Sequence, residues 1–143
     1  MTRLLPRRSD RHTLAAPRRT RTICVVDPQP ADYLGWESLA QAGGVELCFV
    51  ADAEQALRLS RTQPVDLWVI NTELPGLSGY ELCGMLKAQH PRSTVFVVAD
   101  KYSAAAERLA WAHRATLFSV KPEQYSWLSL WEQSRSRRSE PSF

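Results

Sequence analysis

Short apolar runs alternate with amphipathic stretches along this chain from Thr22 onward. Each apolar run is rich in β-branched residues and nearly continuous in hydrophobicity, which is typical of strands buried on both faces of a parallel sheet. The alternation predicts βα units packed around such a sheet. The strands are expected at residues 23–26, 45–50, 65–70, 94–98 and 116–120.

The amphipathic stretches between and after these strands predict helices that begin and end at recognisable residues. Gly43 and Gly44 end the first helix, and Asp52 and Ser78 are placed to cap the second and third. Right-handed crossovers put helices on both faces of the sheet, so a three-layer α/β sandwich is expected. Any site is expected beyond the carboxyl ends of the strands. The helices are expected at about residues 32–42, 53–62, 79–89, 104–113 and 123–133.

One such domain accounts for the 143 residues, of which 44% are hydrophobic. The formal net charge of +3 belongs to the two ends, because residues 22–134 carry 8 basic and 13 acidic side chains. Residues 1–21 are therefore expected to be a disordered, arginine-rich arm, 22–133 the folded domain, and 134–143 a disordered basic tail. This charge distribution argues against a globular nucleic-acid-binding domain.

The cysteines and the hydropathy indicate the compartment. Cys24, Cys48 and Cys83 are odd in number and lie in apolar or helical stretches, so they are expected to be free thiols in a reducing cytoplasm. No run approaches the roughly 20 apolar residues of a membrane span. The basic start is not followed by the apolar stretch of a secretory signal.

Three segments, in order, make residues 22–133 resemble the receiver domain of response regulators. Residues 25–28 stand where the family has an apolar strand that ends in two acids. Residues 66–71, with the loop 75–79, are similar to the strand that carries the phosphoacceptor aspartate and to its Pro-x-x-x-Gly loop. Residues 118–122 are similar to the last strand, with its switch aromatic and Lys-Pro end. The resemblance implies a flavodoxin-like (βα)5 fold with strand order 2-1-3-4-5.

The chain departs from that family at the phosphorylation site. The family's chemistry needs an aspartate nucleophile, carboxylates for Mg²⁺, a hydroxyl and a lysine. Here Asn71 stands at the acceptor position, Pro28 replaces one acid, and Ala99 replaces Thr or Ser. These losses together predict a degenerate pseudo-receiver that is not an enzyme. Phe118, at the switch position, and Trp68, within a strand, are expected to be packing residues.

Asp27, Glu73 and Lys121 remain, with Asp100 next to the lost hydroxyl position. In one interpretation, Asp27 and Glu73 hold a divalent cation weakly. In the other, Lys121 pairs with Asp27 or bonds to Asn71 and fixes one conformation. The second is favoured because an isolated, partly buried charge is costly. No cofactor is therefore expected.

The last expected helix, 123–133, is more apolar than one buried stripe requires. Tyr125 and Leu128 fall toward an edge, where Trp111 of the preceding helix can join them, and contiguous exposed apolar surface usually marks an interface. In the alternative, this helix covers a wide gap in the core. The residues assigned to its core face are Trp127, Leu130 and Trp131.

These observations predict a stand-alone receiver-like module in a two-component or phosphorelay pathway, independent of phosphorylation and acting through protein–protein interaction. The expected partner is a signalling protein, such as a histidine kinase, or a second copy of the chain. In the alternative, the arginine-rich ends bind nucleic acid or anionic lipid. Another enzymatic chemistry is disfavoured because the strand ends offer no nucleophile, and the histidines at 12, 90 and 113 have no metal-ligand spacing.

Overall fold

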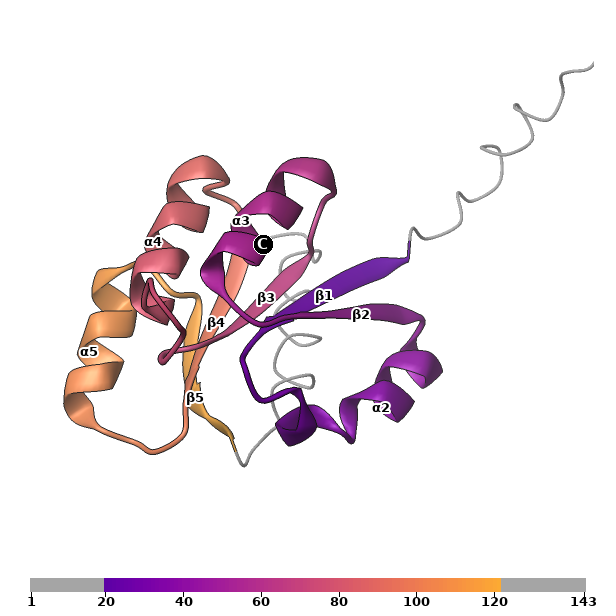
Figure 1. Cartoon of the computed structure of the whole chain (residues 1–143), viewed down its shortest axis with the longest axis horizontal. Helices are drawn as coiled ribbons and strands as arrows, with labels where there is room; N and C mark the ends of the chain where they lie inside the picture. The colour runs from indigo at the N-terminus through magenta and orange to yellow at the C-terminus, as the bar shows by residue number, and fades with distance from the viewer. Residues whose placement is uncertain (1–19, 122–143) are drawn as a thin grey trace, which may run out of the picture.

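A computed structural model describes residues 20–121, which form a five-stranded parallel sheet in the order β2-β1-β3-β4-β5 (Figure 1). This order confirms the predicted fold. Most strand bounds agree with the sequence expectation to within two residues. The strands are β1 (Arg21–Val26), β2 (Val45–Val50), β3 (Leu67–Asn71), β4 (Thr94–Ala99) and β5 (Leu117–Val120). Arg21, expected in the arm, is the first residue of β1, so the strand begins one residue before the expected domain.

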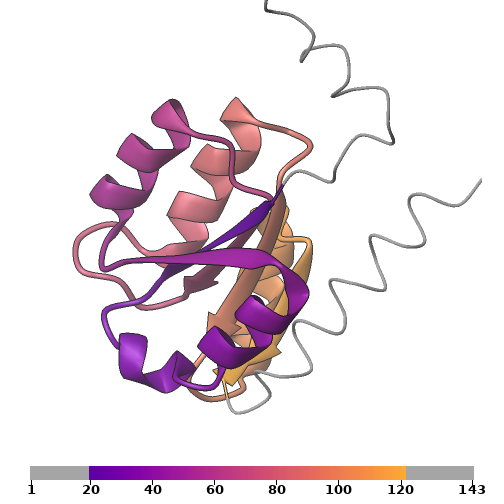
Figure 2. The ribbon, with the colours of Figure 1, turned by 90° about the vertical axis from the view of Figure 1, so that its right-hand side faces the viewer.

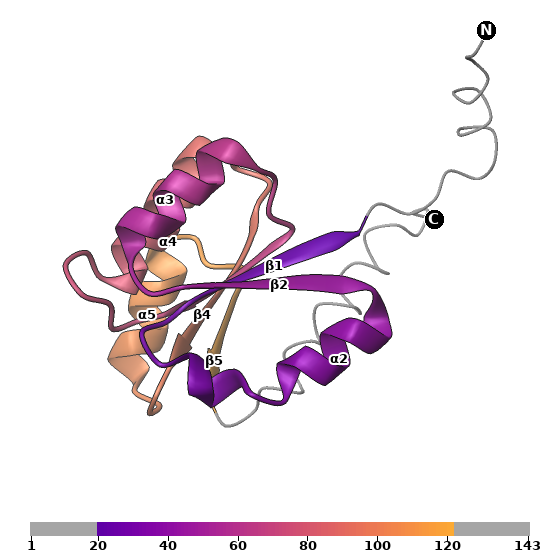
Figure 3. The ribbon, with the colours of Figure 1, turned by 45° about the vertical axis from the view of Figure 1, so that its right-hand side comes forward.

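Helices cover both faces of the sheet. Figures 2 and 3 show α3 and α4 on one side and α2 on the other. The helical elements are η1 (Pro30–Tyr33), α2 (Trp36–Gly43), α3 (Ala53–Thr62), α4 (Gly79–Gln89) and α5 (Ala104–Ala112). The expected helix at 123–133 lies outside the described residues. Within residues 20–121, no helix is long and apolar enough to cross a membrane.

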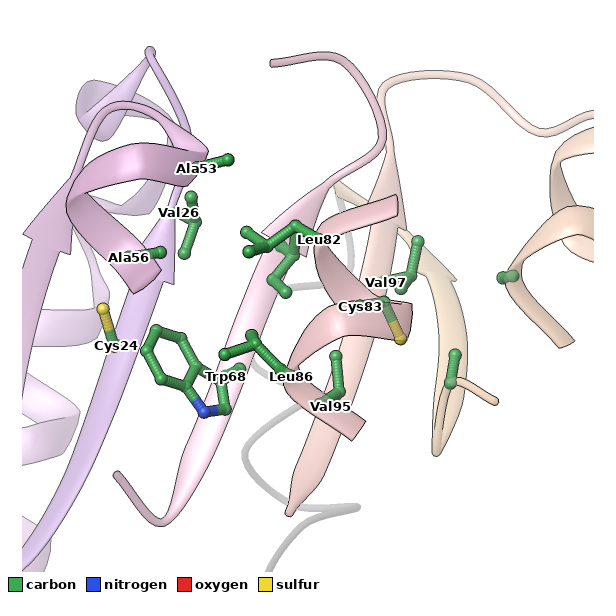
Figure 4. Close-up of a cluster of buried hydrophobic side chains, with 13 residues drawn as sticks. Cys24, Val26, Ala53, Ala56, Trp68, Leu82, Cys83, Leu86, Val95 and Val97 are labelled. Atoms are coloured by element: carbon green, nitrogen blue, oxygen red, sulfur yellow. The ribbon is translucent and has the colours of Figure 1, made fainter. Parts of the chain in front are cut away.

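Alternate residues of each strand pack into two separate cores, because successive side chains of a strand point to opposite faces of the sheet. The core under α3, α4 and α5 takes Cys24 and Val26 from β1, with Trp68 at its centre (Figure 4). The core on the other face takes Ile23 and Val25 from the same strand. The sheet is thus buried on both sides, as its nearly continuous hydrophobicity predicts.

The helix ends follow the capping residues. Ser78 accepts a hydrogen bond from the backbone N–H of Glu81, whose side chain accepts one from the N–H of Ser78, which forms a capping box. Asp52 caps α3 through the N–H of Gln55. Gly44 ends α2 in the left-handed conformation, at φ +69°. These caps set where each helix meets the sheet.

The first helix was predicted wrongly as one element over 32–42. The chain instead makes the 3-10 turn η1, with Pro30 in its first positions, and α2 begins only after Gly35. The turn carries Tyr33 into the core, where its ring packs edge-on against Trp36 at 5.5 Å. The separate 3-10 turn therefore places the Tyr33 ring beside the end of β1.

The third strand begins at Leu67, two residues later than predicted. Asp66 lies just before it and bonds to the backbone of Thr22 twice: its N–H donates to the carbonyl at 2.9 Å, and its carboxylate accepts from the N–H at 2.7 Å. The carboxylate provides the acceptor for the Thr22 N–H just before the β1–β3 register begins at Ile23 and Leu67. Asp66 thus marks the start of the β1–β3 pairing.

Replacing Trp68 by Ala is expected to lower the free energy of unfolding by ~3–5 kcal/mol, because the indole is 2% exposed and its removal leaves a cavity. Trp111→Ala is the matched control, since that indole is 46% exposed and its loss should cost about 0.5 kcal/mol or less. Urea unfolding followed by circular dichroism measures both. Equal losses would show that the core is not centred on Trp68.

Candidate functional site

Four polar side chains gather at the carboxyl edge of the sheet. Asp27 directly follows β1, Asn71 ends β3, Asp100 follows β4, and Lys121 follows β5. Parallel strands end at the same edge, and this is where the strand order reverses around β1 and β3, the usual position of a site in such sheets. The alternation of strands and helices therefore brings together residues up to 94 positions apart in the sequence.

Lys121 makes ion pairs with three carboxylates. Its Nζ lies 3.0 Å from Asp27, 2.6 Å from Asp32 and 3.1 Å from Asp100. The residue is only 9% exposed. Burial acts to lower the pKa of Lys121, but hydrogen bonds to the three carboxylates outweigh it and raise that pKa above its ordinary value. The ammonium group is therefore charged at any physiological pH.

Asp27 is a buried carboxylate, 2% exposed, with both oxygens engaged. Its Oδ2 accepts from the Tyr33 hydroxyl at 2.8 Å and from the Asn71 amide at 3.0 Å, and it meets Lys121. Its Oδ1 accepts the N–H of Gln29 at 2.9 Å. Burial and the charge of Asp27 raise the pKa of Tyr33, so its hydroxyl stays protonated and donates. A buried charge with this many donors is well satisfied.

The side-chain amide of Asn71 both donates and accepts hydrogen bonds. Its Nδ2 donates to Asp27 at 3.0 Å and to Asp100 at 3.3 Å, while its Oδ1 accepts the N–H of Glu73 at 2.7 Å. Burial opposes ionisation of Asp100, but hydrogen bonds from Lys121 and Asn71 lower the pKa of its carboxyl. An aspartate at position 71 would instead place a third carboxylate against these two. The position is thus complementary to an amide.

Close backbone packing holds Asn71 in place. The N–H of Gly79, the first residue of α4, donates to the carbonyl of Thr72 at 3.0 Å. A Cβ built on Gly79 would lie 1.9 Å from the carbonyl oxygen of Asn71. Only glycine allows α4 to begin this close to the end of β3. The glycine of the Pro-x-x-x-Gly loop therefore has a steric role here.

The remaining predicted residues of the phosphorylation site border this network, and among residues 20–121 their side chains make no hydrogen bond with it. Pro28 and the side chain of Glu73 are exposed, and Ala99 is buried and offers no hydroxyl. Phe118 packs against the core under α3–α5 and lies edge-on to Tyr102 at 6.2 Å. Among residues 20–121, no cluster of three or more His, Cys, Asp or Glu side chains could hold a metal ion.

Sequence reasoning missed Asp32 and Tyr33 as site residues. Both lie in η1, and an α-helix running from residue 32 gives no reason to place them at the carboxyl edge of the sheet. Pro30, which is favoured at the first position of a helix, indicates a helical start before residue 32, but nothing in the pattern shows that this turn ends at Tyr33. The pairing of Lys121 with Asp27, by contrast, is the arrangement that the sequence favoured.

The predicted interface is described only in part. Trp111 on α5 is exposed, and its indole N–H donates to Glu107 at 3.2 Å. Glu107 also accepts from the Tyr102 hydroxyl at 2.8 Å. Tyr102, in the loop before α5, and Leu109, on α5, are also exposed, and neither was predicted. Tyr125 and Leu128, like Trp127, Leu130 and Trp131, lie outside the described residues.

Replacing Lys121 by Met is expected to lower the free energy of unfolding by roughly 3 kcal/mol at pH 7, because it leaves the buried charge of Asp27 without its cation. Adding Asp27→Asn should recover part of this loss, since the charge itself is then removed. Urea unfolding of both variants measures the effect. If Lys121→Met is as stable as the wild type, the ion pairs do not stabilise the fold.

The contribution of Lys121 to the free energy of unfolding should depend on pH in a defined direction. The pKa of Lys121 is raised on folding, so its stabilising contribution is complete below about pH 10 and is lost as the pH rises above the value of the unfolded chain. Between pH 7 and 9 the difference between wild type and Lys121→Met should therefore stay constant, and above about pH 10 it should shrink.

The fold and the site can be compared with solved structures. The signal receiver domain of an HD domain-containing protein from Pseudomonas fluorescens Pf-5 is 26% identical, with a TM-score of 0.73 over 85% of this chain and 100% of that one. A CheY-like receiver domain protein from Methanospirillum hungatei JF-1 is 18% identical, with a TM-score of 0.74 over 86% and 100%. A response regulator of Thermotoga maritima, solved with Mg²⁺ and BeF, is 23% identical, with a TM-score of 0.68 over 80% and 97%.

No curated protein matches the chain significantly. The family of the response regulator receiver domain, however, matches residues 23–129, which include every strand of the sheet except the first two residues of β1. The match also covers Asp27, Asn71 and Lys121, at the strand ends where the polar network forms. The chain therefore belongs to the response regulator receiver domain family.

Proposed function

We propose that this chain is a pseudo-receiver: a cytoplasmic signalling module of a two-component or phosphorelay pathway that acts by binding another protein, without being phosphorylated. One observation carries the proposal. The side chain at the acceptor position, Asn71, donates to Asp27 and Asp100, where a nucleophilic carboxylate would have to face both of them. An amide at this position is a poor nucleophile and a fitting hydrogen-bond donor.

The metal requirement of phosphoryl transfer supports the same proposal. A hard cation such as Mg²⁺ is usually held by one or two carboxylates whose oxygens are free to bind it. Asp27 already meets Lys121, Asn71 and Tyr33 through one oxygen. Pro28 supplies no carboxylate in place of the family's second acid. The ammonium of Lys121 thus supplies, within the chain, the positive charge that a divalent ion would bring.

The same contacts favour a single conformation. Lys121 bridges the residues that follow β1 and β4, and Asn71 bonds to the same two carboxylates from β3. In the family that this chain resembles, the lysine meets the phosphoryl group when it arrives. Here the lysine is engaged already. The surface that partners contact would then be permanently formed, and signalling would depend on how much of the protein is present.

The proposed binding surface is at α5, where Trp111 is exposed and where Tyr102, in the loop before the helix, donates to the same Glu107 carboxylate. Tyr125 and Leu128, outside the described residues, are proposed to extend it. The partner is a signalling protein, such as a histidine kinase, or a second copy of the chain. Nucleic-acid binding through residues 1–21 and 134–143 is less favoured, since residues 22–134 are acidic on balance.

Acetyl phosphate or beryllium fluoride with Mg²⁺ is expected to leave the protein unchanged, because Asn71 has no carboxylate to modify. Intact mass should show no gain of a phosphate, and the tryptophan fluorescence should stay constant. Phosphate or beryllofluoride bound at Asn71 would contradict the proposal.

Asn71→Asp alone is expected not to restore efficient phosphorylation, because Pro28 still lacks a metal-binding carboxylate and Ala99 still lacks a hydroxyl. The triple variant Asn71→Asp, Pro28→Asp, Ala99→Thr is the matched positive control, and it should take up phosphate from acetyl phosphate. Efficient labelling of the single variant would show that the acceptor residue alone decides activity.

Changing Tyr125 to Ser and Leu128 to Glu, or Trp111 to Ser, should weaken self-association or binding to the partner, since buried apolar area contributes about 25 cal/mol per Å². Leu34→Ser is the matched control: Leu34 is 74% exposed but lies between η1 and α2, away from α5. Sedimentation equilibrium, with thermal melts to check folding, separates the variants. A wild type that is monomeric at high concentration would refute self-association, and equal effects of all variants would refute the α5 surface.

A further inference from the structure

Two cysteines lie side by side in adjacent strands. Cys24 of β1 and Cys48 of β2 are direct partners in the parallel register. Register partners in parallel strands project from the same face of a sheet, and both side chains belong to the core under α3, α4 and α5. Figure 4 shows Cys24 on the sheet face that α3 covers. The two thiols therefore form a pair across the first two strands.

The two thiols differ in their surroundings. Cys24 is completely buried, whereas Cys48 is half-buried on β2, the edge strand of the sheet. A hydrogen bond between them lowers the pKa of Cys48 and raises that of Cys24, which burial raises further. Cys48 is thus the thiol that ionises first and that reagents can reach, and Cys24 is the thiol that keeps its proton.

We propose that Cys24 and Cys48 are an oxidisable dithiol, which a hydroperoxide converts into a disulfide joining β1 to β2. The Cys48 thiolate attacks the peroxide: an S–O bond forms, the O–O bond breaks, and the released oxygen leaves as water after taking a proton. The Cys24 sulfur then attacks the Cys48 sulfenic acid: the S–S bond forms, the S–O bond breaks, and a second water leaves with the Cys24 proton. Two thiols and one hydrogen peroxide thus give one disulfide and two waters.

The backbone geometry suits this bond. Neighbouring strands lie about 4.7–4.9 Å apart, within the roughly 4.4–6.8 Å of Cα separation that disulfides span. The edge position of β2 leaves one side of the strand free of sheet pairing. In a reducing compartment such a bond is transient, as in proteins that sense oxidants. This property is independent of the acceptor site and goes beyond the proposed function.

The bond would act on the strand pair that carries Asp27. The backbone N–H of Asp27 donates to the carbonyl of Val50 at 3.0 Å, at the end of the same two strands. A covalent link between Cys24 and Cys48 would hold β2 in this register. Oxidation should therefore leave the fold in place and make the β1–β2 pair harder to separate.

The test treats the full chain with hydrogen peroxide and digests it without reductant. We expect a loss of two hydrogen atoms from the intact mass, a peptide that links Cys24 to Cys48, and complete reversal by dithiothreitol. Cys83→Ser is the matched control and should form the same bond, because Cys83 lies on α4 and its thiol contacts the carbonyl of His113. A folded wild type that forms no bond, or a bond that needs Cys83, would overturn the proposal.

A second variant tests the order of the steps. In Cys24→Ala, oxidation should stop at the Cys48 sulfenic acid, which dimedone traps, and Cys48 should react with iodoacetamide only at higher pH than in the wild type. Circular dichroism confirms that this variant is folded. If instead dimedone labels Cys24 in a Cys48→Ser variant as readily as it labels Cys48 in Cys24→Ala, the assignment of the attacking thiol is wrong and the proposed dithiol fails.

Discussion

The ammonium group of Lys121, surrounded by carboxylates from three segments of the chain, is the contact on which the site depends. It offsets part of the negative charge that β1 and β4 bring to the carboxyl edge of the sheet, and it follows the last described strand. Its Nζ also lies 5.7 Å from the centre of the Tyr33 ring, so an aromatic face shares in holding the charge. Without a cation here, the buried carboxylate of Asp27 would have only neutral donors.

Asn71 shows how one substitution can fit the rest of a site. Its amide supplies two donors to two carboxylates and an acceptor to a backbone N–H, so each polar atom of the side chain has a partner. A carboxylate at this position would lose both donors and add repulsion. The surroundings therefore match the amide, and loss of the acceptor aspartate is accompanied by a coherent set of hydrogen bonds.

The sequence predicted the sheet and three of the helices, because buried parallel strands and capped helices have strong local signals, whereas the strand order came from the resemblance to receiver domains. It also placed Asp27, Asn71, Asp100 and Lys121 at one edge, since parallel strands end together. It could not predict η1 or the roles of Asp32 and Tyr33. Those depend on how a short turn after Pro30 packs against a strand, which hydrophobic periodicity does not encode. The sequence also could not show that Cys24 and Cys48 are neighbours, because that depends on the register between β1 and β2.

The carboxylate of Glu107 has a consequence for the partner binding that we propose for α5. It accepts from the Tyr102 hydroxyl and the Trp111 indole together, and the Tyr102 ring also rests against Phe118. Large side chains on a free surface lose rotational entropy when a partner covers them. Two aromatic rings that are already oriented by one carboxylate lose less. Glu107 would thus favour binding without touching the partner, by restricting beforehand the motions that complex formation would otherwise have to freeze.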